Sequence, residues 1–181
     1  YVHPWAEEMN KSRRMAALAS RTLAEQGHAV LQVDLLGCGD SSGDLADASW
    51  EDWVQDALDA AAWLARRHPG RPAAQPTWLW GHREGALLAA AAAARMPEPV
   101  QLLLWQPVLQ GRQALQQFLR LKAAAQLADG GGKGVVEGLR AELAAGRTVE
   151  VAGYTLGPAL AQGLESAVLT PPPVSTDPAD T

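Results

Sequence analysis

At its centre the sequence reads Trp78-Leu79-Trp80-Gly81-His82-Arg83-Glu84-Gly85, followed directly by the apolar residues 86–90. This pattern predicts a short apolar strand, a tight turn and an alanine-rich helix. Gly81 and Gly85 lack a Cβ, so the strand and the helix can approach each other closely around the turn. Such a turn forces its middle residue into a strained backbone conformation and lifts it above the sheet edge. That residue is Arg83, whose permanent positive charge cannot attack a carbonyl.

The composition predicts one globular domain with a hydrophobic core. The chain has 181 residues, is 48% hydrophobic and carries a net charge of −5, which argues against nucleic acid as a partner. Cys38 is the only cysteine, so no internal disulfide is expected; with no signal-peptide pattern at the start, this favours a cytoplasmic location. No apolar run reaches the roughly 18 residues of a membrane span. We predict no cofactor and no metal site.

Strands and helices are predicted to alternate over the first 105 residues, which indicates an α/β fold with a doubly wound, mostly parallel sheet. Ser49 and Asp52 form a capping-box pattern at the start of the most secure helix. The predicted strands are residues 1–2, 29–33, 78–80 and 100–105, and the predicted helices are residues 10–26, 50–67 and 86–96. Five tryptophans are predicted to lie in core elements: Trp50, Trp53, Trp78, Trp80 and Trp105.

The chain divides by pattern into three parts. Residues 1–110 form the predicted α/β core, residues 111–169 a helical, cap-like insertion with a glycine-rich break at 130–134, and residues 170–181 a proline-rich tail expected to be disordered. The first two residues look like the end of a strand. We therefore expect a core that is incomplete at both ends.

Residues 34–43 form a loop rich in glycine and small polar residues, at the carboxyl end of a predicted strand, where α/β sheets bind ligands. Asp34 can orient a ligand there or cap N–H groups of the loop, and capping is the commoner role. Cys38 and Ser41 can be substitute nucleophiles or simply residues that the turn requires, and the second reading is the more common.

The role of Arg83 also has two possible interpretations. Arg83 can bind a carboxylate or phosphate at the N-terminus of the following helix, or it can form a structural ion pair with Glu84 or Asp34. The neighbouring His82 can reach a ligand or simply pack against its surroundings. Small acyl or anionic molecules are the ligands that these residues favour.

Three motifs together resemble the α/β-hydrolase superfamily: His3-Pro4 after a strand, the turn from Asp34 to Ser41, and Gly81-His82-x-x-Gly85. Residues 2–14 and 34–43 are more narrowly similar to the second type of hydrolase associated with the exosortase A system. The resemblance covers residues 1–108 well. It implies a hydrolase fold and a link to bacterial exopolysaccharide and protein-sorting loci.

The resemblance implies a nucleophile elbow at residues 81–85, with a serine expected where this chain has Arg83. The backbone N–H groups of Glu84 and Trp5 are the implied oxyanion hole, because Pro4 has no N–H. In this superfamily a histidine follows the nucleophile, whereas the chain contains no histidine after Arg83. The predicted ligand-binding residues are His3, Asp34, Ser41 and His82.

Two functions follow as hypotheses. The first is an ester or thioester hydrolase, or an acyl transferase, that works without the elbow serine. The second is a ligand-binding or scaffold protein of a polysaccharide locus that has no catalytic activity. The elbow and the oxyanion loop favour the first hypothesis, and the arginine favours the second.

Overall fold

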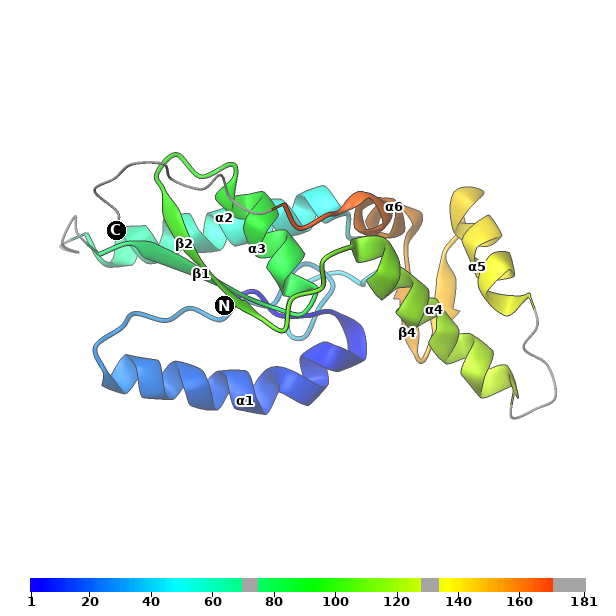
Figure 1. Ribbon diagram of the computed structural model, residues 1–181, viewed down its shortest axis with the longest axis horizontal. Helices are drawn as coiled ribbons and strands as arrows, with labels where there is room; N and C mark the ends of the chain where they lie inside the picture. Colours follow the sequence, from blue (N-terminus) through cyan, green and yellow to red (C-terminus); the bar gives the residue numbers. More distant parts are fainter. Residues whose placement is uncertain (70–74, 128–133, 171–181) are drawn as a thin grey trace.

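The computed structural model describes residues 1–69, 75–127 and 134–170 of the chain. Within these ranges, helices surround a parallel strand pair, and a second helical region with a small hairpin lies at one end (Figure 1). In chain order the elements are α1 (Ala6–Glu25), α2 (Trp50–Arg67), β1 (Thr77–His82), α3 (Gly85–Ala93), β2 (Val100–Trp105), α4 (Gly111–Leu127), α5 (Val135–Ala144), β3 (Val149–Val151), β4 (Tyr154–Leu156) and α6 (Pro158–Ser166).

The centre of the fold is the parallel pair β1 and β2, which aligns His82 with Trp105 at the carboxyl ends of the strands. On the other side of β1, Val2 forms a parallel bridge to Gly81. The Val2 N–H donates to the Trp80 carbonyl at 2.8 Å, and the His82 N–H donates to the Val2 carbonyl at 3.1 Å. The predicted α/β class with a parallel sheet is confirmed.

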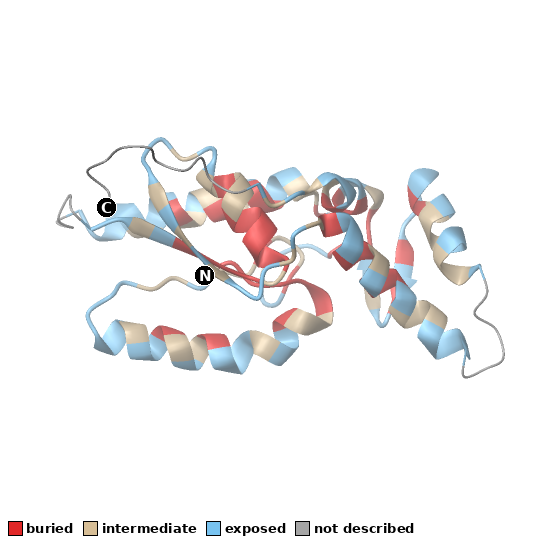
Figure 2. Cartoon of the chain, viewed as in Figure 1, coloured by how far each residue is buried: buried red, intermediate tan, exposed pale blue. Residues whose placement is uncertain are grey.

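Helices lie on both sides of this sheet. Helices α2 and α3 lie on one face and α1 runs along the other (Figure 1). Figure 2 shows that α3 is the most continuously buried helix, and six of its nine residues are buried. An alanine-rich helix suits this position, because small side chains allow it to pack closely against both the strands and α2.

The capping box of α2 is present as predicted. The Ser49 hydroxyl oxygen accepts from the Asp52 N–H at 3.1 Å, and the Asp52 carboxylate accepts from the Ser49 N–H at 2.9 Å. Both bonds satisfy N–H groups that the first turn of a helix leaves free. Trp53, Val54 and Ala57 form the buried face of this helix.

The strand predicted at residues 29–33 does not form. This segment has neither helical nor strand structure, and Asp34 follows an irregular stretch instead. A strand exists only where a neighbouring backbone pairs along its length. Beside residues 29–33 lies the start of the chain, where the Tyr1 amino group donates to the Leu31 carbonyl at 2.8 Å. A single bond of this kind does not make a strand.

The prediction that five tryptophans lie in the core needs correction for two of them. Trp78 and Trp105 are 57% and 38% exposed, because their face of the sheet is only partly covered. Residues 149–156 form an antiparallel hairpin of β3 and β4. Its two loop residues, Ala152 and Gly153, both have positive φ, as the favoured two-residue hairpin turns require.

The region from α4 to α6 packs on its own apolar side chains, and backbone hydrogen bonds tie its two ends together. The Gly111 N–H donates to the Ala167 carbonyl at 2.8 Å, and the Leu169 N–H donates to the Leu109 carbonyl at 2.9 Å. Leu119, Leu160 and Leu164 are fully buried. The predicted glycine-rich break and tail fall mainly outside the described residues.

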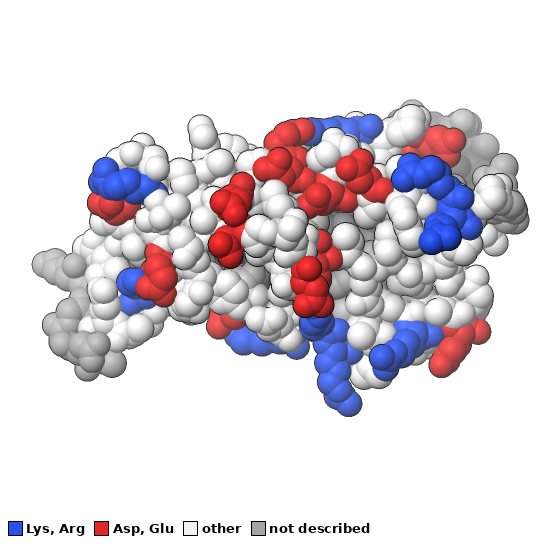
Figure 3. All heavy atoms as spheres, turned by 180° about the vertical axis from the view of Figure 1, so that it is seen from behind, with Lys and Arg blue, Asp and Glu red and all other residues white. Residues whose placement is uncertain are grey.

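Charged side chains are unevenly spread over the surface. On the face seen from behind, acidic side chains gather over the middle and Lys and Arg lie nearer the rim (Figure 3). In the part of the chain that the structure describes, no helix combines the length and the apolar character that crossing a membrane requires.

Candidate functional site

The turn between β1 and α3 holds Arg83 in the left-handed region, with φ +54°. Two backbone hydrogen bonds hold it there: the Arg83 N–H donates to the Trp105 carbonyl at 3.0 Å, and the Val108 N–H donates to the Arg83 carbonyl at 3.2 Å. The turn is therefore fastened to the end of β2. A left-handed arginine is uncommon, and such strain is often found at functional sites.

The two glycines beside the turn are required by close backbone approaches. A Cβ on Gly81 would lie 2.5 Å from the Ala86 Cα, and a Cβ on Gly85 would overlap the carbonyl oxygens of Val2 and His3. The glycine spacing therefore acts as the sequence predicts. It lets α3 start directly beneath the end of β1 and against the loop that leads into α1.

A cleft of about 460 Å³ lies between α1 and the carboxyl ends of β1 and β2. It is a shallow cleft that is largely open to solvent. Arg83 and His82 line it as predicted site residues. The complete lining is Glu8, Lys11, Ser12, Met15, His82, Arg83, Trp105 and Gln106.

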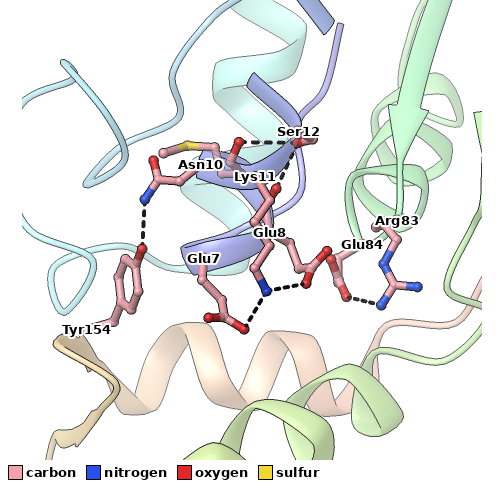
Figure 4. A network of polar contacts seen from close by, with 9 residues as sticks. Glu7, Glu8, Asn10, Lys11, Ser12, Arg83, Glu84 and Tyr154 are labelled. Carbon is pink, nitrogen blue, oxygen red and sulfur yellow. Dashed lines mark hydrogen bonds and ion pairs between the residues drawn. The ribbon is translucent and has the colours of Figure 1, made fainter. Parts of the chain in front are cut away.

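Helix α1 supplies half of this lining, which the sequence analysis missed. Glu8, Lys11, Ser12 and Met15 are three or four positions apart and so share one helix face. The Lys11 Nζ contacts Glu7 at 3.1 Å and Glu8 at 3.4 Å (Figure 4). The spacing was visible in the sequence, but it does not show which element this face meets.

Glu84 lies behind Arg83 at the end of the cleft, where Figure 4 shows its carboxyl group between Glu8 and the guanidinium. The Arg83 Nη2 and Glu84 Oε1 atoms are 4.0 Å apart. Burial, and to a smaller extent the nearby Glu8, raises the pKa of Glu84, although its own backbone N–H and Arg83 oppose this rise. Among the described residues, Glu84 Oε2 and Arg83 Nε are buried without a hydrogen-bond partner. The sequence predicted an ion pair of Arg83 with either Glu84 or Asp34. The structure has the pair with Glu84, at the longest distance that still counts as an ion pair.

His82 is packed at the floor of the cleft. Its ring stacks on Trp105 with 4.8 Å between centroids, and its Nδ1 lies 3.3 Å from the Tyr1 hydroxyl. Burial, and then the positive charge of Arg83, lowers the pKa of His82. The ring is therefore neutral near pH 7, and Arg83 and Lys11 are the positive groups of the cleft.

Strained backbone gathers around this site. Among the described residues, four that are not glycine have positive φ: Ala6, Arg83, Gln106 and Ala152. Arg83 and Gln106 line the cleft, and Ala6 begins α1, the helix that forms the opposite wall. Such conformations cost about 1–3 kcal/mol each and cluster at ligand sites.

His3 and Asp34 line a different, smaller cavity of about 130 Å³. The His3 Nε2 accepts from the Leu35 N–H at 3.2 Å and its Nδ1 lies 2.6 Å from the Pro4 carbonyl, so both nitrogens are engaged. Burial lowers the pKa of His3. These bonds give His3 a structural role in joining two loops.

Asp34 binds its own loop and α1 rather than Arg83. Its Oδ2 accepts from the Asp40 N–H at 3.0 Å and from the Arg13 guanidinium at 2.6 Å. Burial alone would raise the pKa of Asp34, but the hydrogen bonds from Asp40 and Arg13 outweigh burial and lower it. The ion pair considered between Asp34 and Arg83 is therefore absent, and the loop-capping reading of Asp34 agrees with these contacts.

The remaining predicted site residues lie outside the lining of the cleft. Ser41 is in the 34–43 loop, where its N–H donates to the Cys38 carbonyl at 3.0 Å. Burial, followed by the charges of Asp34 and Asp56, raises the pKa of Cys38 to about 12, so its thiol stays protonated and a poor nucleophile. Trp5 is buried and packs on Phe118, with 4.4 Å between ring centroids.

No group of three or more His, Cys, Asp and Glu side chains in the described ranges is arranged to hold a metal ion. The side chains that line the cleft offer a guanidinium, an ammonium already engaged by carboxylates, a neutral imidazole and an apolar wall. This combination suits binding and orienting an organic anion.

Comparison with known proteins supports this reading of the fold. Residues 8–136 match the family model described as "Serine aminopeptidase, S33". Searches of the curated proteins and of the solved structures give no significant match. The matched residues include the strand–turn–helix at Arg83, all but the first two residues of α1, and both strands of the parallel pair. The chain therefore belongs to the serine aminopeptidase S33 family of the α/β-hydrolase superfamily.

Proposed function

We propose that this chain is a hydrolase-fold protein that binds a small organic anion through Arg83 and does not use an elbow nucleophile. In this proposal Arg83 occupies the position of the serine that the superfamily places at its elbow. The observation that carries the proposal is the left-handed Arg83, held in a strained turn with its guanidinium lining a cleft. A guanidinium is fully protonated and donates up to five hydrogen bonds, so it binds carboxylates and cannot form an acyl-enzyme.

Incomplete pairing of Arg83 supports an anion as the ligand. Its side chain is 31% exposed, its Nε has no partner among the described residues, and Glu84 stands 4.0 Å away. Burial raises the pKa of Glu84, and Glu84 Oε2 has no hydrogen-bond partner among the described residues, so the carboxyl group and the guanidinium are only loosely paired. The N-terminus of α3 directly follows Arg83, and its dipole adds to the attraction of an anion.

The narrower assignment is also a proposal. Residues 2–14 and 34–43 resemble the second type of exosortase A system-associated hydrolase, and we propose that the chain serves a bacterial exopolysaccharide locus. We propose a cytoplasmic location, with residues 1–110 as the core and 111–169 as the cap-like region. Nucleic acid is not a proposed partner, since the net charge is −5.

Calorimetric titration with benzoate tests the proposal, with benzamide as the neutral analogue. We expect benzoate to bind the full chain and benzamide to bind at least tenfold more weakly, because a charge-assisted hydrogen bond contributes about 1.5–3 kcal/mol. Arg83→Gln should lose benzoate binding by a similar factor. Arg120→Gln, which changes an exposed arginine on α4, is the matched control and should bind as the wild type does.

A second measurement distinguishes binding from catalysis. The purified protein should not hydrolyse p-nitrophenyl acetate faster than its Arg83→Ala variant does. Equal benzoate affinity in wild type and Arg83→Gln would overturn the binding proposal. Ester turnover that depends on Arg83 would favour the hydrolase hypothesis instead.

A further inference from the structure

The cleft beside Arg83 has an apolar wall that anion binding alone does not require. Met15 on α1 is 53% exposed and Trp105 at the end of β2 is 38% exposed, and both side chains line the cleft. Large apolar side chains that stay exposed in a concave, partly charged site are typical of ligand pockets. The wall therefore offers a surface for an apolar group of the ligand.

Trp105 is held rigidly, so it can present a fixed surface. Its ring stacks on His82 with an interplanar angle of 28° and on Trp80 with 5.8 Å between centroids. His82 is its register partner on β1, and Arg83 follows His82 directly. The apolar surface and the guanidinium are thus adjacent, and a single small molecule can contact both.

The charges of the cleft favour a ligand with one negative charge. Among its lining residues, Lys11 and Arg83 are positive and Glu8 is negative, which leaves one net positive charge. Lys11 already contacts Glu7 and Glu8, so Arg83 is the group left for an anion. A doubly charged phosphate would meet the Glu8 carboxylate without a second free cation.

We infer that the ligand is an amphiphilic monocarboxylate, whose carboxylate binds Arg83 and whose alkyl or aryl group lies between Met15 and Trp105. The inference rests on the proposed function and specifies its ligand class. Met15 and Trp105 are the residues that determine specificity. Glu84 lies beside the guanidinium but outside the lining of the cleft, and its buried Oε2 has no hydrogen-bond partner among the described residues.

A chain-length series tests this inference: acetate, butanoate and hexanoate are titrated into the full chain by calorimetry, with hexan-1-ol as the uncharged analogue. We expect the affinity to rise about two- to fourfold for each added methylene, as expected for partial to full burial of each group. Met15→Gln should weaken hexanoate at least fivefold more than it weakens acetate. Leu18→Gln is the matched control, because Leu18 is 39% exposed on the same helix and lies outside the lining of the cleft.

The outcomes separate the inference from the proposed function. Equal affinities along the series, or Met15→Gln behaving as Leu18→Gln does, would overturn the amphiphilic ligand while Arg83-dependent benzoate binding stands. Hexan-1-ol binding as tightly as hexanoate would also overturn it. If neither benzoate nor hexanoate binds, the proposed function fails and the inference fails with it. Trp105→Leu provides a second variant, and thermal melts confirm that each variant is folded.

Discussion

The Arg83 Nη2 atom lies 4.0 Å from Oε1 of Glu84, the next residue in the chain, whose side chain is 8% exposed. The two groups are close enough to attract each other and too far apart for a hydrogen bond. Burial and the nearby Glu8 raise the pKa of Glu84, against the opposing effect of Arg83. The site therefore holds a buried carboxyl group whose ionisation is costly.

Glu84 is expected to make stability depend on pH. Because its folded pKa lies above the ordinary value of 4.5, the folded state binds the proton more tightly, and stability decreases as the pH rises from 4.5 through the folded pKa. Glu84→Gln removes this ionisation. Urea unfolding should show that the variant gains stability relative to wild type between pH 4 and pH 8. A constant difference across this range would contradict the prediction.

His3 should act in the opposite direction. Its folded pKa is lowered by burial, so its contribution to stability is present above the unfolded value of about 6.5 and is lost as the pH falls through the folded pKa. We expect the stability difference between wild type and His3→Gln to shrink as the pH falls from 7.5 to 5. His3→Gln should be less stable at pH 7.5 and show a weaker pH dependence. His28→Gln, at an exposed histidine, should keep the wild-type dependence.

Gly85 should tolerate no side chain. A Cβ there would overlap the Val2 and His3 carbonyl oxygens, which belong to backbone and cannot move aside cheaply. We expect Gly85→Ala to lower the free energy of unfolding by at least about 2 kcal/mol. Gly138→Ala is the matched control, since it lies within α5 with nothing near its Cβ position. It should stabilise the protein by roughly 0.5–1 kcal/mol. Thermal and urea unfolding measure both changes.

Removing the backbone strain at Arg83 should stabilise the protein. Glycine adopts positive φ without a steric cost, so Arg83→Gly is expected to raise the free energy of unfolding by about 1 kcal/mol while it abolishes benzoate binding. Ala152→Gly makes the same backbone change in the β3–β4 turn. It should stabilise to a similar degree and leave binding intact. A destabilised Arg83→Gly variant would show that the guanidinium stem contributes more by packing than the strain costs.

Local patterns predicted the parts of the fold that depend on neighbouring residues. The glycine spacing around Arg83 predicts a turn, and the structure has one with the close approaches that exclude a Cβ. The strand at 29–33 failed because its apolar composition says nothing about whether another backbone lies beside it. Exposure of Trp78 was missed for a related reason, since a strand sequence does not show which face the helices leave open.

The sequence alone determined the tight turn at Arg83 and the capped start of α2, because both depend on sterics and hydrogen bonds within a few residues. It also predicted the α/β-hydrolase superfamily, through motifs spread along the first half of the chain. Only the tertiary structure decided that Glu8, Met15 and Trp105 face Arg83 across one cleft. Glu8 and Met15 on α1 are far in the chain from Arg83 and Trp105. They meet because of how α1 lies against the ends of β1 and β2. The elevated pKa of Glu84 has the same origin, because burial and a distant charge are properties of the folded chain.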